Sequence, residues 1–139
     1  MFNVTNIAAS GLAAERLRLE VAANNLANAQ TTRGHDGEPY RRQQVIFAAA
    51  VDGAMGNSQL TGMRGVTVEG IHRDEKPFLE VFQPGHPDAD ADGMVRMPNV
   101  SVAHEMVDLT TASRSYEANL RVLKTYRQLV EETLALLRG

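Results

Sequence analysis

Three alternating aspartates are the residues in this chain best suited to binding a metal ion. Asp88, Asp90 and Asp92 stand at every second position and Gly93 follows at once, much as in the calcium loop of a helix-loop-helix site. In such a loop the twelfth position supplies a bidentate carboxylate. Counted from Asp88, that position is Asn99, which offers one neutral oxygen.

The same segment is equally well composed for a turn. Aspartate side chains accept hydrogen bonds from nearby backbone N–H groups, and glycine adopts positive φ at little cost. Pro84 and Pro87 precede the segment and Pro98 interrupts it near its end, so the entering helix of a calcium site is missing. The sequence therefore favours a turn over a calcium site.

The histidines do not suggest catalysis. His35, His72, His86 and His104 are dispersed, and none stands at a metal-ligand spacing from another or beside a nucleophile motif. No glycine-rich loop leads to a Lys-Ser or Lys-Thr pair, so no nucleotide site is indicated. We predict that the protein is not an enzyme and that it has no catalytic residue, no cofactor and no metal ion.

Composition narrows the class further. A chain of 139 residues with 43% hydrophobic content, 5% aromatic content and no Trp fits one domain with a modest aliphatic core. The net charge of -3 and scattered basic residues argue against nucleic-acid binding. The absence of Cys excludes disulfides and thiolate metal sites. No run reaches the length of a membrane span, and the N-terminus does not resemble a secretory signal peptide.

The chain has a helical start, a turn-rich middle and a long helical end. Residues 4–28 are rich in Ala and Leu without Pro, which predicts a helix. The segments YRRQQVIF (40–47), GVTVEGI (65–71) and FLEVF (78–82) predict short strands in hairpins. After Pro98, either Asn99 or Ser101 can cap a helix of about ten turns that meets no Gly or Pro before Gly139.

Apolar residues recur every seven positions along the long C-terminal helix. They are Leu109, Tyr116, Leu123, Val130 and Leu137. A period of seven predicts a left-handed supercoiled seam. The alternative is a core-facing stripe in a globular bundle, but a helix this long extends past any core that so short a chain could build.

The N-terminal helix carries two apolar stripes on opposite sides. We expect one stripe to pack on the long helix of the same chain and the other on a neighbouring subunit. A central helix in a monomeric bundle would also bury two sides, and this alternative stays open. The stripes are Leu12, Leu19 and Leu26 on the first side, and Ile7, Ala14, Leu17 and Val21 on the second.

Asn24, Asn25 and Asn28 continue the second stripe. Amides inside a helical interface are costly unless they are paired, and a paired amide fixes the register of the helices. The alternative is that these side chains cap the end of the helix and the turn that follows.

Three parts of the chain resemble bacterial flagellar rod and hook proteins. Ser10-Gly11-Leu12 and the Asn-Asn-Leu-Ala-Asn segment at 24–28 match the N-terminal signature of that family. The segments at 39–47 and 84–125 are similar to those of its proximal rod subunits. Gln43, Met94 and the Thr110-Thr111 pair are mild departures, and residues 48–63 match least.

The resemblance implies a fold and a function. Its members pair their terminal helices as an antiparallel coiled coil, which forms the inner wall of a tubular rod, and carry a small β-rich middle. We therefore expect a mainly α fold with a small β insertion, in which residues 1–36 and 99–139 form a helical coiled-coil domain and residues 37–98 a β-rich domain. The implied function is that of a structural subunit of the proximal rod, the drive shaft that transmits motor torque.

The resemblance also implies an export route and partners. Such proteins are exported unfolded through the flagellar type III apparatus without a cleaved signal and polymerise in the periplasm. The implied partners are copies of the chain, other rod subunits, a basal-body adaptor and the inner-membrane ring with its export gate, without nucleic acid or a membrane span. A soluble coiled-coil adaptor that binds one helical partner is the alternative function.

The residues predicted to mediate assembly share a position on one of the two terminal helices, either in an apolar stripe or in the amide cluster. They are Leu12, Leu17, Leu19, Val21, Asn24, Asn25, Leu26, Asn28, Leu109, Tyr116, Asn119, Leu123 and Val130.

Overall fold

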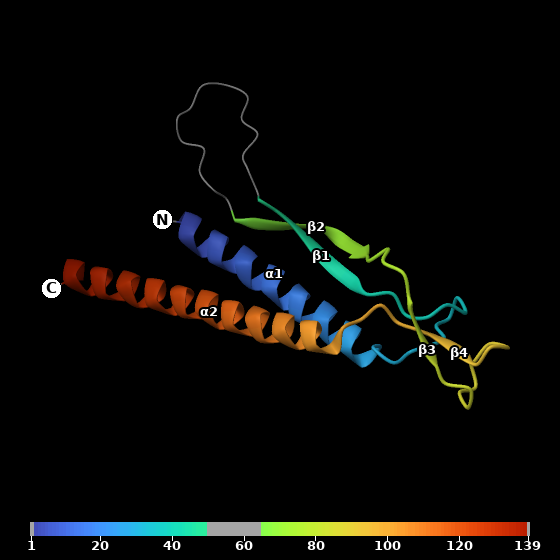
Figure 1. The fold of residues 1–139 in the computed structure, drawn as a ribbon. Coiled ribbons are helices and arrows are strands. Elements are labelled where there is room, and N and C mark those ends of the chain that lie inside the picture. The colour runs from blue at the N-terminus through green and yellow to red at the C-terminus, as the bar shows by residue number, and fades with distance from the viewer. Residues whose placement is uncertain (1, 50–64, 139) are drawn as a thin grey trace, which may run out of the picture.

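Two long helices from the ends of the chain make up most of the computed structural model, which describes residues 2–49 and 65–138. Helix α1 spans Phe2–Ala27 and helix α2 spans Val102–Arg138. They lie side by side and antiparallel, so both chain termini are at the same end of the pair (Figure 1). The predicted mainly α fold with a small β insertion is confirmed. With 37 residues, α2 also has the expected length of about ten turns.

Helix α2 begins directly after Ser101. The carbonyl of Ser101 accepts the N–H of Glu105 at 3.0 Å, which gives Ser101 the N-cap position. Asn99, the other predicted cap, has a different role. Its Oδ1 accepts the backbone N–H of Arg42 at 2.8 Å, and its Nδ2 donates to the carbonyls of Asp74 and Lys76. Asn99 thus joins three loop segments instead of capping the helix.

Four short strands lie between the helices. Strand β1, Gln43–Ala49, pairs antiparallel with β2, Val66–Arg73. Strand β3, Leu79–Phe82, pairs antiparallel with β4, Met94–Met97. Each of the three segments predicted as strands overlaps one of these strands, whereas β4 was not predicted. Its four residues are too few to show a clear alternation, although Val95 is completely buried.

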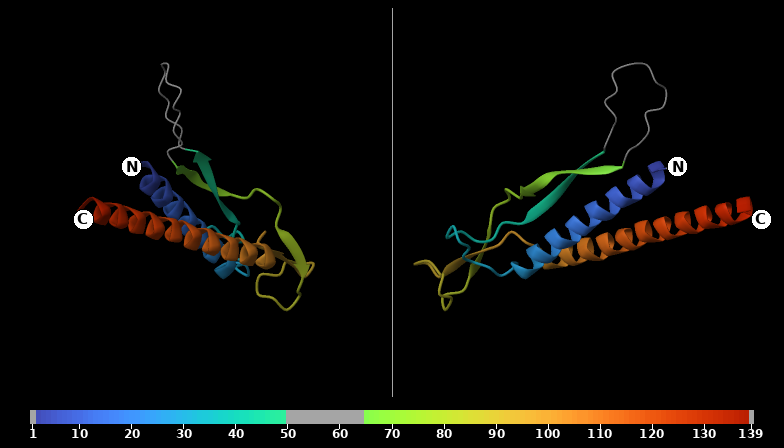
Figure 2. Two further views of the ribbon diagram at one scale, coloured as in Figure 1. Left: turned by 90° about the vertical axis from the view of Figure 1, so that its left-hand side faces the viewer. Right: turned by 180° about the vertical axis from the view of Figure 1, so that it is seen from behind.

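Helix α1 lies between α2 and the β1–β2 hairpin. Strands β1 and β2 both contact α1, and the hairpin runs along the side of α1 that faces away from α2 (Figures 1 and 2). At the start of β2, the backbone N–H of Val66 donates to Ser10 Oγ of α1 at 3.1 Å. The division into a helical domain and a β-rich domain stays a prediction.

The buried apolar core of the described residues is small and rich in alanine. It consists of Ala8, Ala14, Val21, Ala22, Val95 and Ala112. Small side chains let the two helices approach closely, but they remove little apolar surface from water. Several large aliphatic side chains on α2 stay exposed, and apolar surface of this extent is typical of a protein that assembles with others. They include Val107, Val122, Leu129, Leu136 and Leu137.

Candidate functional site

Asn25 joins both helices to the first strand. Its side chain is 1% exposed. Its Nδ2 donates to the backbone carbonyl of Gln43 at 2.8 Å and to Glu105 Oε2 at 2.9 Å. Its Oδ1 accepts the N–H of Gln43 and the hydroxyl of Tyr40, each at 2.9 Å. A side-chain amide has two donors and two acceptor sites, so these four bonds use its whole capacity within the chain.

A buried ion pair continues this network on α2. Arg42 Nε donates to Glu105 Oε1 at 2.5 Å, and the Glu105 side chain is 1% exposed. Together with the bond from Asn25, this engages both carboxylate oxygens of Glu105. The Arg42 guanidinium also approaches Asp74 at 3.9 Å and Asp108 at 3.5 Å. A buried charge is tolerated when it is paired and hydrogen-bonded in this way.

One group of titratable side chains in the described residues has metal-ligand spacing. His104, Glu105 and Asp108 each offer one ligand atom, and these atoms lie within 4.8 Å of one another. However, Glu105 is bonded to Arg42, and Asp108 accepts a 2.9 Å bond from Arg18 of α1. Two arginines thus already supply positive charge where a metal ion would, so we interpret the cluster as an ion-pair network between the helices.

Tyr40 connects the same network to the end of α1. Its hydroxyl lies 2.9 Å from Asn25 Oδ1 and 3.2 Å from Asn24 Oδ1. Burial raises the pKa of the Tyr40 hydroxyl, and the nearby Glu105 carboxylate raises it further, while Arg73 opposes the shift. The neutral, hydrogen-bonding form of Tyr40 is therefore favoured.

Asn24 and Asn28 have the capping role that was the alternative for the amide cluster. Asn28 Nδ2 donates to both the carbonyl and Oδ1 of Asn24 at 2.9 Å, and its Oδ1 accepts the hydroxyl of Thr31 at 3.2 Å. These bonds close the last turn of α1 and fix the turn that follows. A role for Asn24 and Asn28 in assembly stays a prediction.

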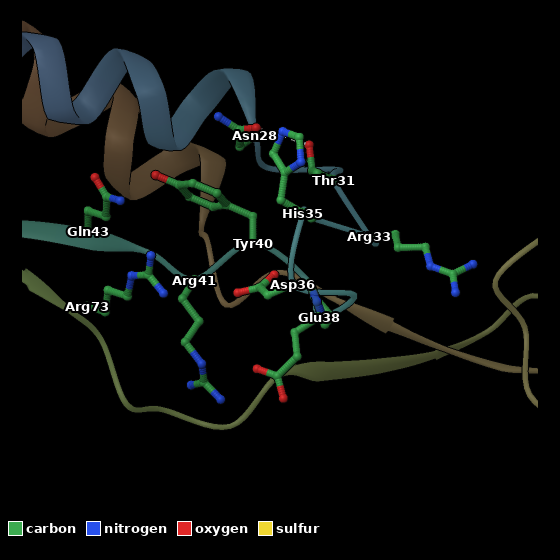
Figure 3. Close-up of a pocket in the computed structure, with 12 residues that line it drawn as sticks. Asn28, Thr31, Arg33, His35, Asp36, Glu38, Tyr40, Arg41, Gln43 and Arg73 are labelled. Atoms are coloured by element: carbon green, nitrogen blue, oxygen red, sulfur yellow. Dashed lines mark hydrogen bonds between the residues drawn. The ribbon is translucent and has the colours of Figure 1, made fainter.

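A pocket of about 590 Å³ lies beyond the end of α1. Figure 3 shows the Tyr40 ring reaching back beneath the helix end, whereas Arg33 extends away from it. Arg33 and Arg73 line the pocket together with Asp36 and Glu38, so it presents both signs of charge. This mixture does not favour a ligand of either charge.

The aspartate segment forms the predicted turn between β3 and β4. Asp90 Oδ1 accepts the backbone N–H groups of Asp92 at 3.0 Å and Met94 at 2.8 Å. Gly93 has a φ of 76°, in the region that favours glycine. Asp88 is directed elsewhere, because its carboxylate accepts a 2.8 Å bond from the hydroxyl of Thr32.

The two helices approach each other closely at Gly11. A Cβ atom at this position would lie 2.9 Å from Nδ2 of Asn119 on α2, so glycine leaves room for that amide. Four of the five predicted seam residues of α2, Leu109, Tyr116, Leu123 and Val130, are half-buried, whereas the fifth, Leu137, is 79% exposed. The other predicted assembly residues that are half-buried are Asn119 of α2 and Leu12, Leu17, Leu19 and Leu26 of α1.

The prediction that Val21 faces a neighbouring subunit is wrong. Val21 is 7% exposed within the single chain, where it lines a groove of about 390 Å³ together with Val45 and Phe47 of β1. Helix α1 does bury two sides, but its own chain supplies the cover on both. The prediction failed because it treated the middle segment as a separate outer unit and left the hairpin out of the packing.

Comparisons with known proteins give a consistent result. Residues 6–34 match the family model described as flagella basal body rod protein, and residues 91–136 match the one described as flagellar basal body rod FlgEFG protein C-terminal. The chain is 49% identical to the flagellar basal-body rod protein FlgC of Salmonella typhimurium over 136 residues, which cover 98% of this chain and 97% of the relative.

More distant relatives carry the same description. The FlgC protein of Borreliella burgdorferi is 40% identical, with 100% of this chain and 99% of the relative covered. That of Bacillus subtilis is 39% identical, with 96% and 95% covered. Neither helix of the described structure combines the length and apolar character needed to cross a membrane.

Proposed function

The chain belongs to the FlgC family of flagellar basal-body rod proteins, and from this we propose that it forms the proximal part of the rod and transmits torque through its paired terminal helices. It is a structural subunit of the flagellar rod and not an enzyme. The observation that carries the proposal is 49% identity to a rod protein over 98% of the chain. At that coverage both helices and the strands between them belong to the similar region.

The architecture supports a mechanical role. A subunit of a rotating shaft must transmit force between its helices without letting them slide past each other. Polar side chains that pair at defined positions resist such sliding better than uniform apolar contacts do. The Asn25–Glu105 and Arg18–Asp108 bonds fix the register of α1 against α2 at two points. The bond from Asn25 to Gln43 extends this link to β1.

We further propose the export route and contacts that the family resemblance implies. The chain would pass unfolded through the flagellar type III apparatus, without loss of a signal peptide, and assemble in the periplasm. Its partners there would be other rod subunits, a basal-body adaptor and the inner-membrane ring with its export gate. The small alanine-rich core is compatible with export as an unfolded chain, since little buried surface opposes unfolding.

A complementation experiment tests this proposal. The chain is supplied to a flagellated bacterium whose own copy has been deleted, and its basal bodies are isolated and reconstructed by electron cryomicroscopy. We expect restored motility and density for α1 and α2 at the base of the rod. Complete rods in the deletion strain without the chain, or density for the chain outside the rod, would contradict the proposal.

A further inference from the structure

The β3–β4 hairpin is attached to the rest of the molecule by connecting segments and not by packing of its strands. Among the described helices and strands, the backbones of β3 and β4 approach only each other, whereas β1 and β2 lie along α1. Figure 1 shows the hairpin beyond the end of the helix pair at which α1 ends and α2 begins. The orientation of the β3–β4 hairpin therefore depends on the segments that connect it to the helices.

Four of these segments meet at that end of the helix pair. We call them the joint: residues 28–31, 40–43, 73–76 and 98–101. Backbone hydrogen bonds connect the first three. The N–H of Tyr40 donates to the carbonyl of Thr31 at 3.0 Å, and the N–H of Asp74 donates to the carbonyl of Arg42 at 2.8 Å. The fourth segment is connected to them by a side chain.

Asn99 is the residue that makes this connection. Its Oδ1 accepts the backbone N–H of Arg42 at 2.8 Å, and its Nδ2 donates to the carbonyls of Asp74 at 3.1 Å and Lys76 at 3.2 Å. A side-chain amide carries both donors and acceptors, so a single residue binds an N–H of one segment and carbonyls of another. Asn99 thus ties the segment that leads into α2 to the segments before β1 and after β2.

Arg41 holds the same part of the chain from a second direction. Its guanidinium lies 4.2 Å from the ring centroid of Phe78, and the guanidinium of Arg96 in β4 lies 4.9 Å from the same centroid. Both distances are in the range of a cation–π contact. Arg41 Nη1 also donates to the carbonyls of Asp74 at 3.5 Å and Lys76 at 3.4 Å. These bonds are longer than those of Asn99, and we expect them to be weaker.

We propose that the joint is rigid and that Asn99 closes it, so that the angle between the β3–β4 hairpin and the helix pair is fixed in the subunit. A hinge needs a few connecting residues that can change φ and ψ freely. Here four segments would have to move together, and hydrogen bonds link each of them to another. This inference goes beyond the proposed function, because it concerns the single subunit and does not depend on assembly.

Pulsed electron paramagnetic resonance tests the joint as a distance distribution between two nitroxide labels. The chain has no Cys, so the labels attach only to introduced cysteines. Labels at Ala13 of α1 and Ala91 between β3 and β4 span the joint, whereas labels at Ala13 and Gln128 lie within the helix pair, and all three positions are exposed. We expect Asn99→Ala to broaden the first distribution and shift its mean, and to leave the second unchanged. The matched control Gln44→Ala removes an exposed amide of β1 and should change neither.

A second variant separates a loose joint from a general loss of structure. Asn99→Asp keeps the acceptor for Arg42 but has no amide donor for the carbonyls of Asp74 and Lys76, so it should also broaden only the distribution across the joint. If Asn99→Ala broadens both distributions, Asn99→Asp decides. A broad distribution across the joint in the unmodified chain would overturn the inference. An unchanged distribution in Asn99→Ala, or broadening of both in Asn99→Asp, would overturn it as well.

Discussion

Asn25 of α1 and Glu105 of α2 form a 2.9 Å hydrogen bond although they are 80 residues apart in sequence. Both side chains are 1% exposed, and they lie near the end of α1 and the start of α2, where the β1 strand also begins. The two terminal helices are therefore joined at this end of the pair by hydrogen bonds between polar side chains, whereas the buried apolar core consists mostly of alanine.

Replacement of Asn25 by alanine should strongly destabilise the subunit. The change leaves the part-buried N–H and C=O of Gln43 and the buried Oε2 of Glu105 without their Asn25 partner, and each buried unsatisfied group costs about 1–3 kcal/mol. We expect Asn25→Ala to lower the free energy of unfolding by about 3 kcal/mol or more, measured by urea denaturation. The exposed Asn24→Ala is the matched control, and an equal loss in both variants would contradict the role assigned to Asn25.

The Arg42–Glu105 ion pair should show strong coupling in a double-mutant cycle. Arg42→Met leaves the buried Glu105 carboxylate without its positive partner, a change that typically costs about 3–5 kcal/mol. Glu105→Gln removes the charge that needs this partner, so the double variant should lose less stability than the sum of the single variants. Thermal or chemical denaturation of the four proteins measures the difference. Additive losses would show that the pair acts as two independent contacts.

The raised pKa of the Tyr40 hydroxyl predicts that the folded protein loses stability at alkaline pH. Burial raises the pKa of its hydroxyl above the ordinary value of 10.0, so the folded state holds this proton more tightly than the unfolded state. The stabilising effect is complete below pH 10 and disappears as the pH rises through the raised pKa. Tyr40→Phe should be less stable than the wild type at neutral pH, because it lacks the bonds to Asn24 and Asn25. Its stability should fall less steeply above pH 10, and a parallel decline of both proteins would contradict the assignment.

The sequence was sufficient to predict the two helices, because heptad spacing and the absence of Pro and Gly in α2 are local signals. It also predicted the aspartate turn, whose hydrogen bonds involve residues four positions apart or fewer. The side on which Val21 packs could not be read from a helical wheel. A wheel shows that a residue is buried but does not identify the element that covers it.

The hydrogen-bond network around Asn25 and Glu105 was not predicted, because its partners cannot be identified from local sequence either. Arg42 and Glu105 are 63 residues apart in the sequence, and each is an ordinary surface residue type when taken alone. The one available signal was the paired-amide argument for the asparagine cluster. It correctly required partners for a buried amide, but it did not identify the partners of Asn25 as Gln43, Tyr40 and Glu105 of the same chain.

Calcium should leave the stability of the protein unchanged. Asp90 Oδ1 already accepts two backbone N–H groups, and Asp88 is bonded to Thr32, so the carboxylates do not converge on one point. We expect millimolar calcium to cause no shift in the melting temperature, measured by differential scanning calorimetry. An upward shift that Asp90→Ala abolishes would establish a calcium site, because a ligand that binds only the folded state raises its stability.

The last prediction separates the buried side of α1 from the exposed side of α2. Val21, which was predicted to contact a neighbour, is 7% exposed, whereas Leu136, which was not, is 84% exposed. Full burial of an aliphatic side chain is worth about 1.5–3 kcal/mol, and an unpaired charge in its place costs more. Val21→Asp should therefore lower the melting temperature of the free subunit by several degrees, whereas Leu136→Asp should leave it unchanged and impair rod assembly in cells. Calorimetry and basal-body yield measure the two effects. An unchanged melting temperature for Val21→Asp would mean that the hairpin does not cover α1 in the free subunit. Normal rods with Leu136→Asp would show that assembly does not need an apolar side chain at that position.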